Sequence, residues 1–166
     1  PKRVAGLTIL NTWAWPADAF ASFFSVMMGG PWGPWLQQKK NFFATTLMEK
    51  SIRNPDRNRP EILAAYSAPF PTPESRRGTY VFPREIRSAR PWLEEIEGKL
   101  GLLVDKPVEM VWAMKDPAFG KEKVIRRWHQ YFPGAPVDRI EEAGHYLQED
   151  APERVAAGIR RLLARL

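Results

Sequence analysis

Two side chains that could together move protons follow two neighbouring apolar segments of the chain. Asp116 follows residues 108–114 with one residue between, and His145 comes shortly after residues 137–141. If both segments are parallel strands, their carboxyl ends meet at one edge of a sheet, where functional groups gather in α/β proteins. A carboxylate there can accept a hydrogen bond from one imidazole nitrogen and leave the other nitrogen to act as a base. The pair therefore predicts an acid–histidine couple that serves a nucleophile.

Each of these residues also has a plain structural interpretation. An aspartate before proline is a common turn former, and a lone histidine in a loop is usually packed or solvated. It is the order acid then histidine, after adjacent strands, that favours catalysis. Metal binding is not expected, because His129 and His145 are the only imidazoles and the chain has no cysteine. No cofactor is expected either.

The elements that must position the pair follow from the apolar pattern. Residues 6–11, 108–114 and 137–141 are short apolar runs, typical of parallel strands buried on both faces. Residues 121–132 carry one apolar helical face, which makes strand, helix and strand a βαβ unit. Asp150 and Glu153 are spaced as a capping box for a last helix.

The long middle of the chain reads as a helical insertion. It is rich in aromatic residues and broken by prolines, and short helices are expected at 17–28, 32–47, 61–66 and 91–100. We therefore predict an α/β chain in three parts: a core strand entering the cap at 1–15, a helical cap at 16–103, and a C-terminal βαβα core with the acid and the histidine at 104–166. Three parallel strands leave apolar edges, so a fuller sheet is implied.

Composition excludes several classes of function. Of 166 residues, 44% are hydrophobic, which is enough for a core, and no cysteine is present for a disulfide or thiol chemistry. We expect a cytoplasmic protein without a membrane span, because no apolar run is long enough to cross a bilayer. The net charge of +6 is spread along the chain, so nucleic acid is not expected as a partner. Without an initiator Met or a signal-like segment, the sequence reads as an entry in mid-protein.

Two motifs resemble a known family. The stretches Lys115-Asp116-Pro117-Ala118-Phe119-Gly120 and Gly144-His145-Tyr146-Leu147-Gln148-Glu149 are similar to the C-terminal half of haloalkane dehalogenases and their α/β-hydrolase relatives. Residues 3–16 resemble the strand that leads into their cap, and 68–71 and 82–85 resemble segments late in such caps. The resemblance implies a partial α/β-hydrolase fold, with parallel sheet strands and a helical cap insertion.

The resemblance also implies roles for individual residues. Asp116 matches the triad acid and His145 the base, while Asn11 stands where some members carry a glutamate as the acid. By position, the substrate pocket would be lined by Asn11, Trp13, Trp15, Phe119 and Tyr146. The indoles of Trp13, Trp15, Trp32 and Trp35 could each donate a hydrogen bond to a departing halide.

The nucleophile of this family is absent from the sequence. The family carries it on a Gly-x-Asp-x-Gly or Gly-x-Ser-x-Gly elbow, and neither occurs in these residues. The chain alone would then be inactive and would need the N-terminal half of the same fold as a partner. It would be a fragment, one of two chains that pair, or a degenerate remnant. The implied substrate is small and apolar, halogenated ones included. Epoxide hydrolysis (with Tyr66 and Tyr80 as acids), ester hydrolysis and a non-catalytic binding role stay open.

Overall fold

The computed structural model describes residues 1–166, which divide into two compact units. The first comprises residues 1–13, 52–57 and 97–166, and the second comprises 14–51 and 58–96. This grouping differs from the predicted three-part division mainly at residues 52–57 and 97–103, which fall with the sheet. None of the helices is long and apolar enough to cross a membrane. The helices, in chain order, are α1 (Ala19–Gly29), η1 (Trp35–Lys39), η2 (Phe43–Leu47), α2 (Met48–Ser51), α3 (Pro60–Ser67), α4 (Arg77–Ser88), α5 (Arg90–Lys99), η3 (Leu100–Leu103), α6 (Glu122–Tyr131), α7 (Leu147–Asp150) and α8 (Pro152–Leu163).

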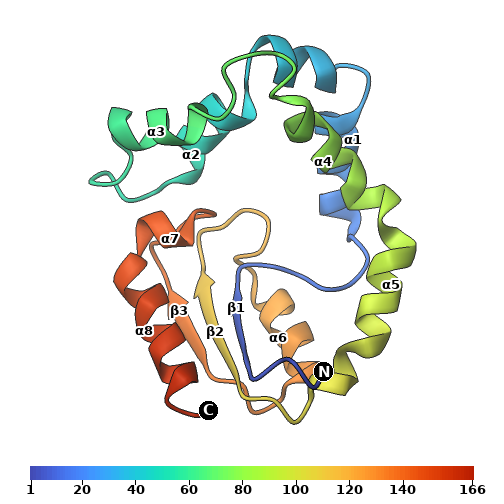
Figure 1. The fold of residues 1–166 in the computed structure, drawn as a ribbon, viewed down its shortest axis with the longest axis vertical. Helices are drawn as coiled ribbons and strands as arrows, with labels where there is room; N and C mark the ends of the chain where they lie inside the picture. The colour runs from blue at the N-terminus through green and yellow to red at the C-terminus, as the bar shows by residue number, and fades with distance from the viewer. The chain divides into compact units, whose positions relative to one another are not determined.

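A three-stranded parallel sheet forms the centre of the first unit (Figure 1). Its strands, β1 (Leu7–Leu10), β2 (Val108–Ala113) and β3 (Val137–Ile140), lie in the order β1-β2-β3. Every residue of the central strand β2 is buried, as expected for a parallel strand covered on both faces. The three predicted strands and the predicted βαβ unit are confirmed.

The two faces of the sheet are covered by different helices (Figure 1). A side-chain carbon on Gly158 of α8 would collide with Val111 of β2, so α8 packs directly on the face that bears Val111. Because alternate residues of a strand point to opposite faces, Met110 and Trp112 point to the other side. There α6 buries Ile125 completely. The strand thus has no solvent-facing side.

A buried charge lies on the α8 face of β2. The side chain of Glu109 is 2% exposed and accepts hydrogen bonds from Arg161 Nε at 2.6 Å and Arg165 Nη2 at 2.8 Å. Arg161 also reaches Asp138 of β3 at 3.2 Å, and Arg154 pairs with the same carboxylate. A carboxylate removed from water is tolerated only when it is paired, so these arginines fix α8 to the sheet.

The start of α8 corrects one prediction. Asp150 and Glu153 do not form a capping box, because the helix begins at Pro152 and its N-cap position is Ala151, without a side-chain cap. Proline is favoured at the first helical position and pushes the preceding residue out of the helix, which moves the cap one residue on from Asp150.

The second unit is helical, as the sequence indicated for this part of the chain. Asp18 caps helix α1, because its side chain accepts a hydrogen bond from Ala21 N at 3.0 Å, and α1 packs against α4. The predicted helices at 17–28, 61–66 and 91–100 are confirmed as α1, α3 and α5.

The predicted single helix at 32–47 is wrong. It is replaced by the π-helical segments η1 and η2, which are separated by residues 40–42, and Asn41 between them has a φ of 52°. Gln37 of η1 bridges this break, because its side chain accepts a hydrogen bond from Phe43 N of η2 at 3.0 Å. Helix α4 was not expected, because it contains Pro83, yet Pro83 and Ile86 are both buried on it.

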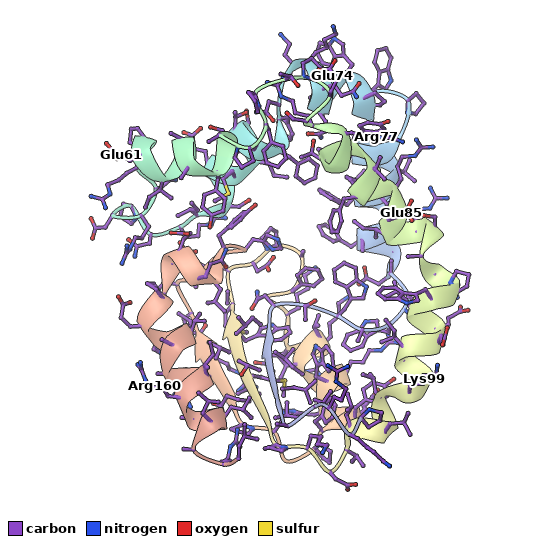
Figure 2. The ribbon with its side chains drawn as sticks, in the orientation of Figure 1. Glu61, Glu74, Arg77, Glu85, Lys99 and Arg160 are labelled. Atoms are coloured by element: carbon purple, nitrogen blue, oxygen red, sulfur yellow. The ribbon has the colours of Figure 1, made fainter.

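We expect the arginine pairs of α8 to carry part of the stability of the sheet. Arg161→Met should lower the free energy of unfolding by about 1–3 kcal/mol, because it leaves buried carboxylate oxygens with fewer donors. Arg160→Met is the matched control, since Arg160 is the adjacent residue on α8 and is exposed (Figure 2). Urea unfolding measures both variants, and equal unfolding midpoints for the two would contradict the assignment.

Candidate active site

The carboxylate of Asp116 and the imidazole of His145 are in contact in the first unit. Asp116 Oδ2 lies 2.9 Å from His145 Nδ1. The loops that follow β2 and β3 are themselves joined by a hydrogen bond of 3.0 Å from Lys115 N to Ala143 O. The Asp116 side chain has no exposed surface, whereas that of His145 is 43% exposed. The pair therefore joins a sealed carboxylate to an imidazole that stays accessible.

Further hydrogen bonds hold the Asp116 carboxylate in its charged form. Asn11 Nδ2 donates to Oδ2 at 2.8 Å, and the backbone N–H of Ala118 donates to Oδ1 at 2.8 Å. Burial raises the pKa of Asp116. The hydrogen bond and charge of His145, together with the hydrogen bonds from Asn11 and the Ala118 backbone, outweigh burial and lower the pKa below the ordinary value of 3.8. An ionised carboxylate can orient the imidazole and stabilise its positive charge.

Asn11 joins the ends of two strands to this carboxylate. It follows β1, has a φ of 29° and is buried. Its Oδ1 accepts from Ala113 N at 2.6 Å and its Nδ2 donates to Ala113 O at 3.1 Å, so the amide pairs with the last residue of β2. The same Nδ2 reaches Asp116. This pairing with a peptide group fixes which way the side-chain amide points.

Aromatic rings surround the imidazole. Trp13 stacks on Phe119 with 4.9 Å between ring centroids, and Phe119 lies 6.0 Å from the His145 ring. Tyr146 meets the imidazole edge to face at 5.6 Å, and burial raises the pKa of its hydroxyl. The indole N–H of Trp13 is buried and has no acceptor among the protein atoms. Of the five residues predicted for the pocket, only Trp15 falls in the second unit.

Asp150, which was predicted to cap the last helix, binds the loop that carries His145. The carboxylate of Asp150 accepts hydrogen bonds from three backbone N–H groups, those of Arg53, Asn54 and Gly144, at 2.8, 2.8 and 2.6 Å. Gly144 directly precedes His145. No local sequence pattern predicts these hydrogen bonds, because Arg53 and Asn54 lie far from Asp150 in the sequence.

Comparisons with known proteins find haloalkane dehalogenases and a decarboxylase among the relatives of this chain. The chain is 37% identical over 159 residues to haloalkane dehalogenase 2 of Mycobacterium bovis, a match that covers 95% of this chain and 55% of that protein. It is 28% identical to cis-3-alkyl-4-alkyloxetan-2-one decarboxylase of Xanthomonas campestris pv. campestris, covering 98% of this chain and 56% of that one. The chain therefore spans about half the length of the curated relatives it matches. No protein-family model matches it.

Solved structures agree with this homology. An ancestral haloalkane dehalogenase superposes with a TM-score of 0.70 at 30% identity, covering 99% of this chain and 62% of that chain. The haloalkane dehalogenase DatA from Agrobacterium tumefaciens C58 gives a TM-score of 0.78 at 22% identity, over 98% and 59% of the two chains, and this match shows the fold alone. The chain is homologous to haloalkane dehalogenases over part of their length and has a partial α/β-hydrolase fold.

The lowered pKa of Asp116 predicts how its contribution to stability depends on pH. A carboxyl group whose pKa is lower in the folded chain stabilises it fully above the unfolded value, and this stabilisation is lost as the pH falls through the folded pKa. The difference in unfolding free energy between the wild type and Asp116→Asn should therefore be larger at pH 5 than at pH 3. Urea titrations at both pH values measure it.

The exposed Asp105 supplies the control for that experiment. Asp105→Asn should change the unfolding free energy little at either pH. A wild-type minus Asp116→Asn difference that is the same at both pH values would show that Asp116 carries no such linkage.

Proposed function

We propose that this chain supplies the acid, the base and the cap of a hydrolase that cleaves carbon–halogen bonds through an alkyl-enzyme ester. The nucleophilic aspartate belongs to another part of the fold. The observation that carries the proposal is the 2.9 Å contact between Asp116 and His145, with the carboxylate sealed and the imidazole accessible. The 37% identity to a haloalkane dehalogenase supports the substrate class.

In this proposal the reaction has two steps. The nucleophilic carboxylate attacks the carbon that bears the halogen, the carbon–halogen bond breaks with its electron pair, and an ester and a halide ion result. His145 then takes a proton from water as the water oxygen attacks the ester carbonyl carbon, and Asp116 stabilises the imidazolium. Collapse of the intermediate releases the alcohol and restores the carboxylate. The balance is one haloalkane and one water to one alcohol, one halide and one proton.

Further groups have parts in the proposed site. Asn11 and the Ala118 N–H hold the acid in place, since both donate to its oxygens. Trp13 is the indole we assign to the halide, because its buried N–H has no acceptor and its ring stacks on Phe119 beside His145. An indole stabilises an anion without bringing a competing charge. Phe119 and Tyr146 would form apolar walls next to the base.

The proposal extends to partners and location. The substrate is a small apolar molecule that carries a halogen, and the partner is the N-terminal half of the same fold, in the same or another chain. A cytoplasmic location is part of this proposal and fits the lack of cysteines. Neither nucleic acid nor a membrane is proposed as a partner.

The match to the decarboxylase requires that the substrate class be tested directly. A relative at 28% identity acts, by its name, as a decarboxylase of oxetan-2-ones. Assays for halide release, epoxide opening, ester hydrolysis and release of carbon dioxide from an oxetan-2-one separate the possible chemistries. Halide release with the other three negative supports the proposal, whereas activity on any of those three without halide release would overturn it.

His145→Ala should stop turnover at the ester. With the nucleophile-bearing segment supplied, the wild type should release halide continuously, whereas the variant should release about one halide per site and then stall, with turnover slowed by about 10²–10⁴-fold. Intact-protein mass spectrometry should detect the added alkyl group. His129→Ala is the control, because His129 is the other histidine and its Nε2 contacts Ala135 O instead. Full turnover by His145→Ala would exclude it as the base.

A further inference from the structure

We propose that Asp150 is a positioning residue for His145. Its carboxylate acts as a clamp that holds the histidine loop, residues 141–146, against residues 52–57. The inference rests on the proposed function, because it assigns to Asp150 a selective effect on the step that His145 catalyses. In this proposal Asp150 contacts neither the ester nor the attacking water. It acts on His145 through its hydrogen bond to the backbone of Gly144.

The hydrogen bonds of Asp150 connect two separate parts of the chain. Its Oδ1 accepts from the N–H groups of Arg53 and Asn54, both at 2.8 Å. Its Oδ2 accepts from Gly144 N at 2.6 Å, one residue before His145. The Asn54 side chain returns a hydrogen bond from Nδ2 to the backbone carbonyl of Asp150 at 3.2 Å. One carboxylate therefore determines where the peptide before the histidine lies.

Residues 52–57 are otherwise anchored in the first unit. They group with the sheet even though the segments before and after them belong to the second unit. Ile52 is 3% exposed, and Arg57 lies 3.8 Å from Glu153 at the start of α8. The segment is thus a fixed support, and Asp150 transfers its position to the histidine loop.

An aspartate suits this position because all three donors are backbone N–H groups. A carboxylate offers only acceptors, and hydrogen bonds from N–H groups to a charged acceptor are stronger than neutral ones. An asparagine has the same shape, but its NH₂ group would face at least one N–H donor. Asp150→Asn therefore weakens the clamp while it preserves the volume of the side chain.

The clamp matters for one half of the reaction more than for the other. In the proposed mechanism His145 has no part in the attack on carbon and is the base for ester hydrolysis. A small displacement of the imidazole should slow hydrolysis by about 10²-fold and leave ester formation unchanged. A merely structural role would instead reduce the amount of folded protein and affect both steps equally.

The experiment compares Asp150→Asn with Asp105→Asn in the complete protein. Asp105 is exposed and lies in neither the histidine loop nor residues 52–57, so its variant, which makes the same chemical change, should retain wild-type rates. Single-turnover mixing with a haloalkane measures the halide burst, which reports ester formation, and quenched-flow mass spectrometry measures the decay of the ester. We expect a normal burst and slow ester decay for Asp150→Asn alone. Wild-type ester decay, or equal slowing of both steps, would overturn the inference.

A second measurement tests the geometry separately from the chemistry. Amide hydrogen exchange at Gly144, Arg53 and Asn54 should be faster in Asp150→Asn than in the wild type, with no change in the strands. If the wild type releases no halide, the proposed function fails, while unchanged exchange at Gly144 would overturn the clamp itself. Should Asp150→Asn fail to fold, Asn54→Ala leaves the Asp150 carboxylate intact and should give a smaller slowing of ester decay. It removes the bond to the Asp150 carbonyl and the bond that Asn54 Oδ1 accepts from Asp56 N. Wild-type ester decay in that variant would likewise count against the clamp.

Discussion

A carboxylate without contact to water sets the main constraint on this structure. The Asp116 side chain has no exposed surface, so every hydrogen bond that water would give it must come from the protein. The donors come from three places in the sequence: Asn11 after the first strand, Ala118 just beyond the acid, and His145 after the third strand. The sheet must therefore bring residues more than one hundred positions apart to within hydrogen-bonding distance, and parallel strands do so because their carboxyl ends share one edge.

The buried Glu109 obeys the same rule with a different outcome. Its partners are Arg161 of α8 and Arg165 just beyond the helix end, which carry a permanent charge, so these ion pairs act as a fixed link between helix and sheet. Asp116 has the imidazole of His145 as its partner, a type of side chain that serves as a base in catalysis. Glu109 lies within β2 and Asp116 follows its end, yet only Asp116 has an accessible imidazole beside it. The nature of the partner, more than burial, distinguishes a structural carboxylate from one suited to catalysis.

The sequence predicted the parts of the molecule that local pattern controls. The three strands and α6 were readable because their apolar residues follow the period of the element, and the contact of Asp116 with His145 follows once the strands are parallel neighbours. Helix α4 was missed, because its Pro83 signals a break, whereas the helix tolerates it where one face is buried. The π-helical turns depend on the Gln37 side chain bonding to the Phe43 backbone. The bonds of Asp150 could not be read at all, because their donors at Arg53 and Asn54 carry no side-chain signature.

The unsatisfied indole of Trp13 connects the fold to the proposed chemistry. A buried N–H without an acceptor costs about 1–3 kcal/mol, and natural folds rarely keep one without a reason. Trp13 immediately follows the β1 loop that carries Asn11, and its ring is held flat on Phe119 at 4.9 Å. Phe119 in turn belongs to the loop whose backbone carries the donors to Asp116. The loop that buries the acid therefore also fixes the indole. An anion released beside His145 would supply the acceptor that Trp13 lacks, so the cost of the free donor would be recovered as the carbon–halogen bond breaks.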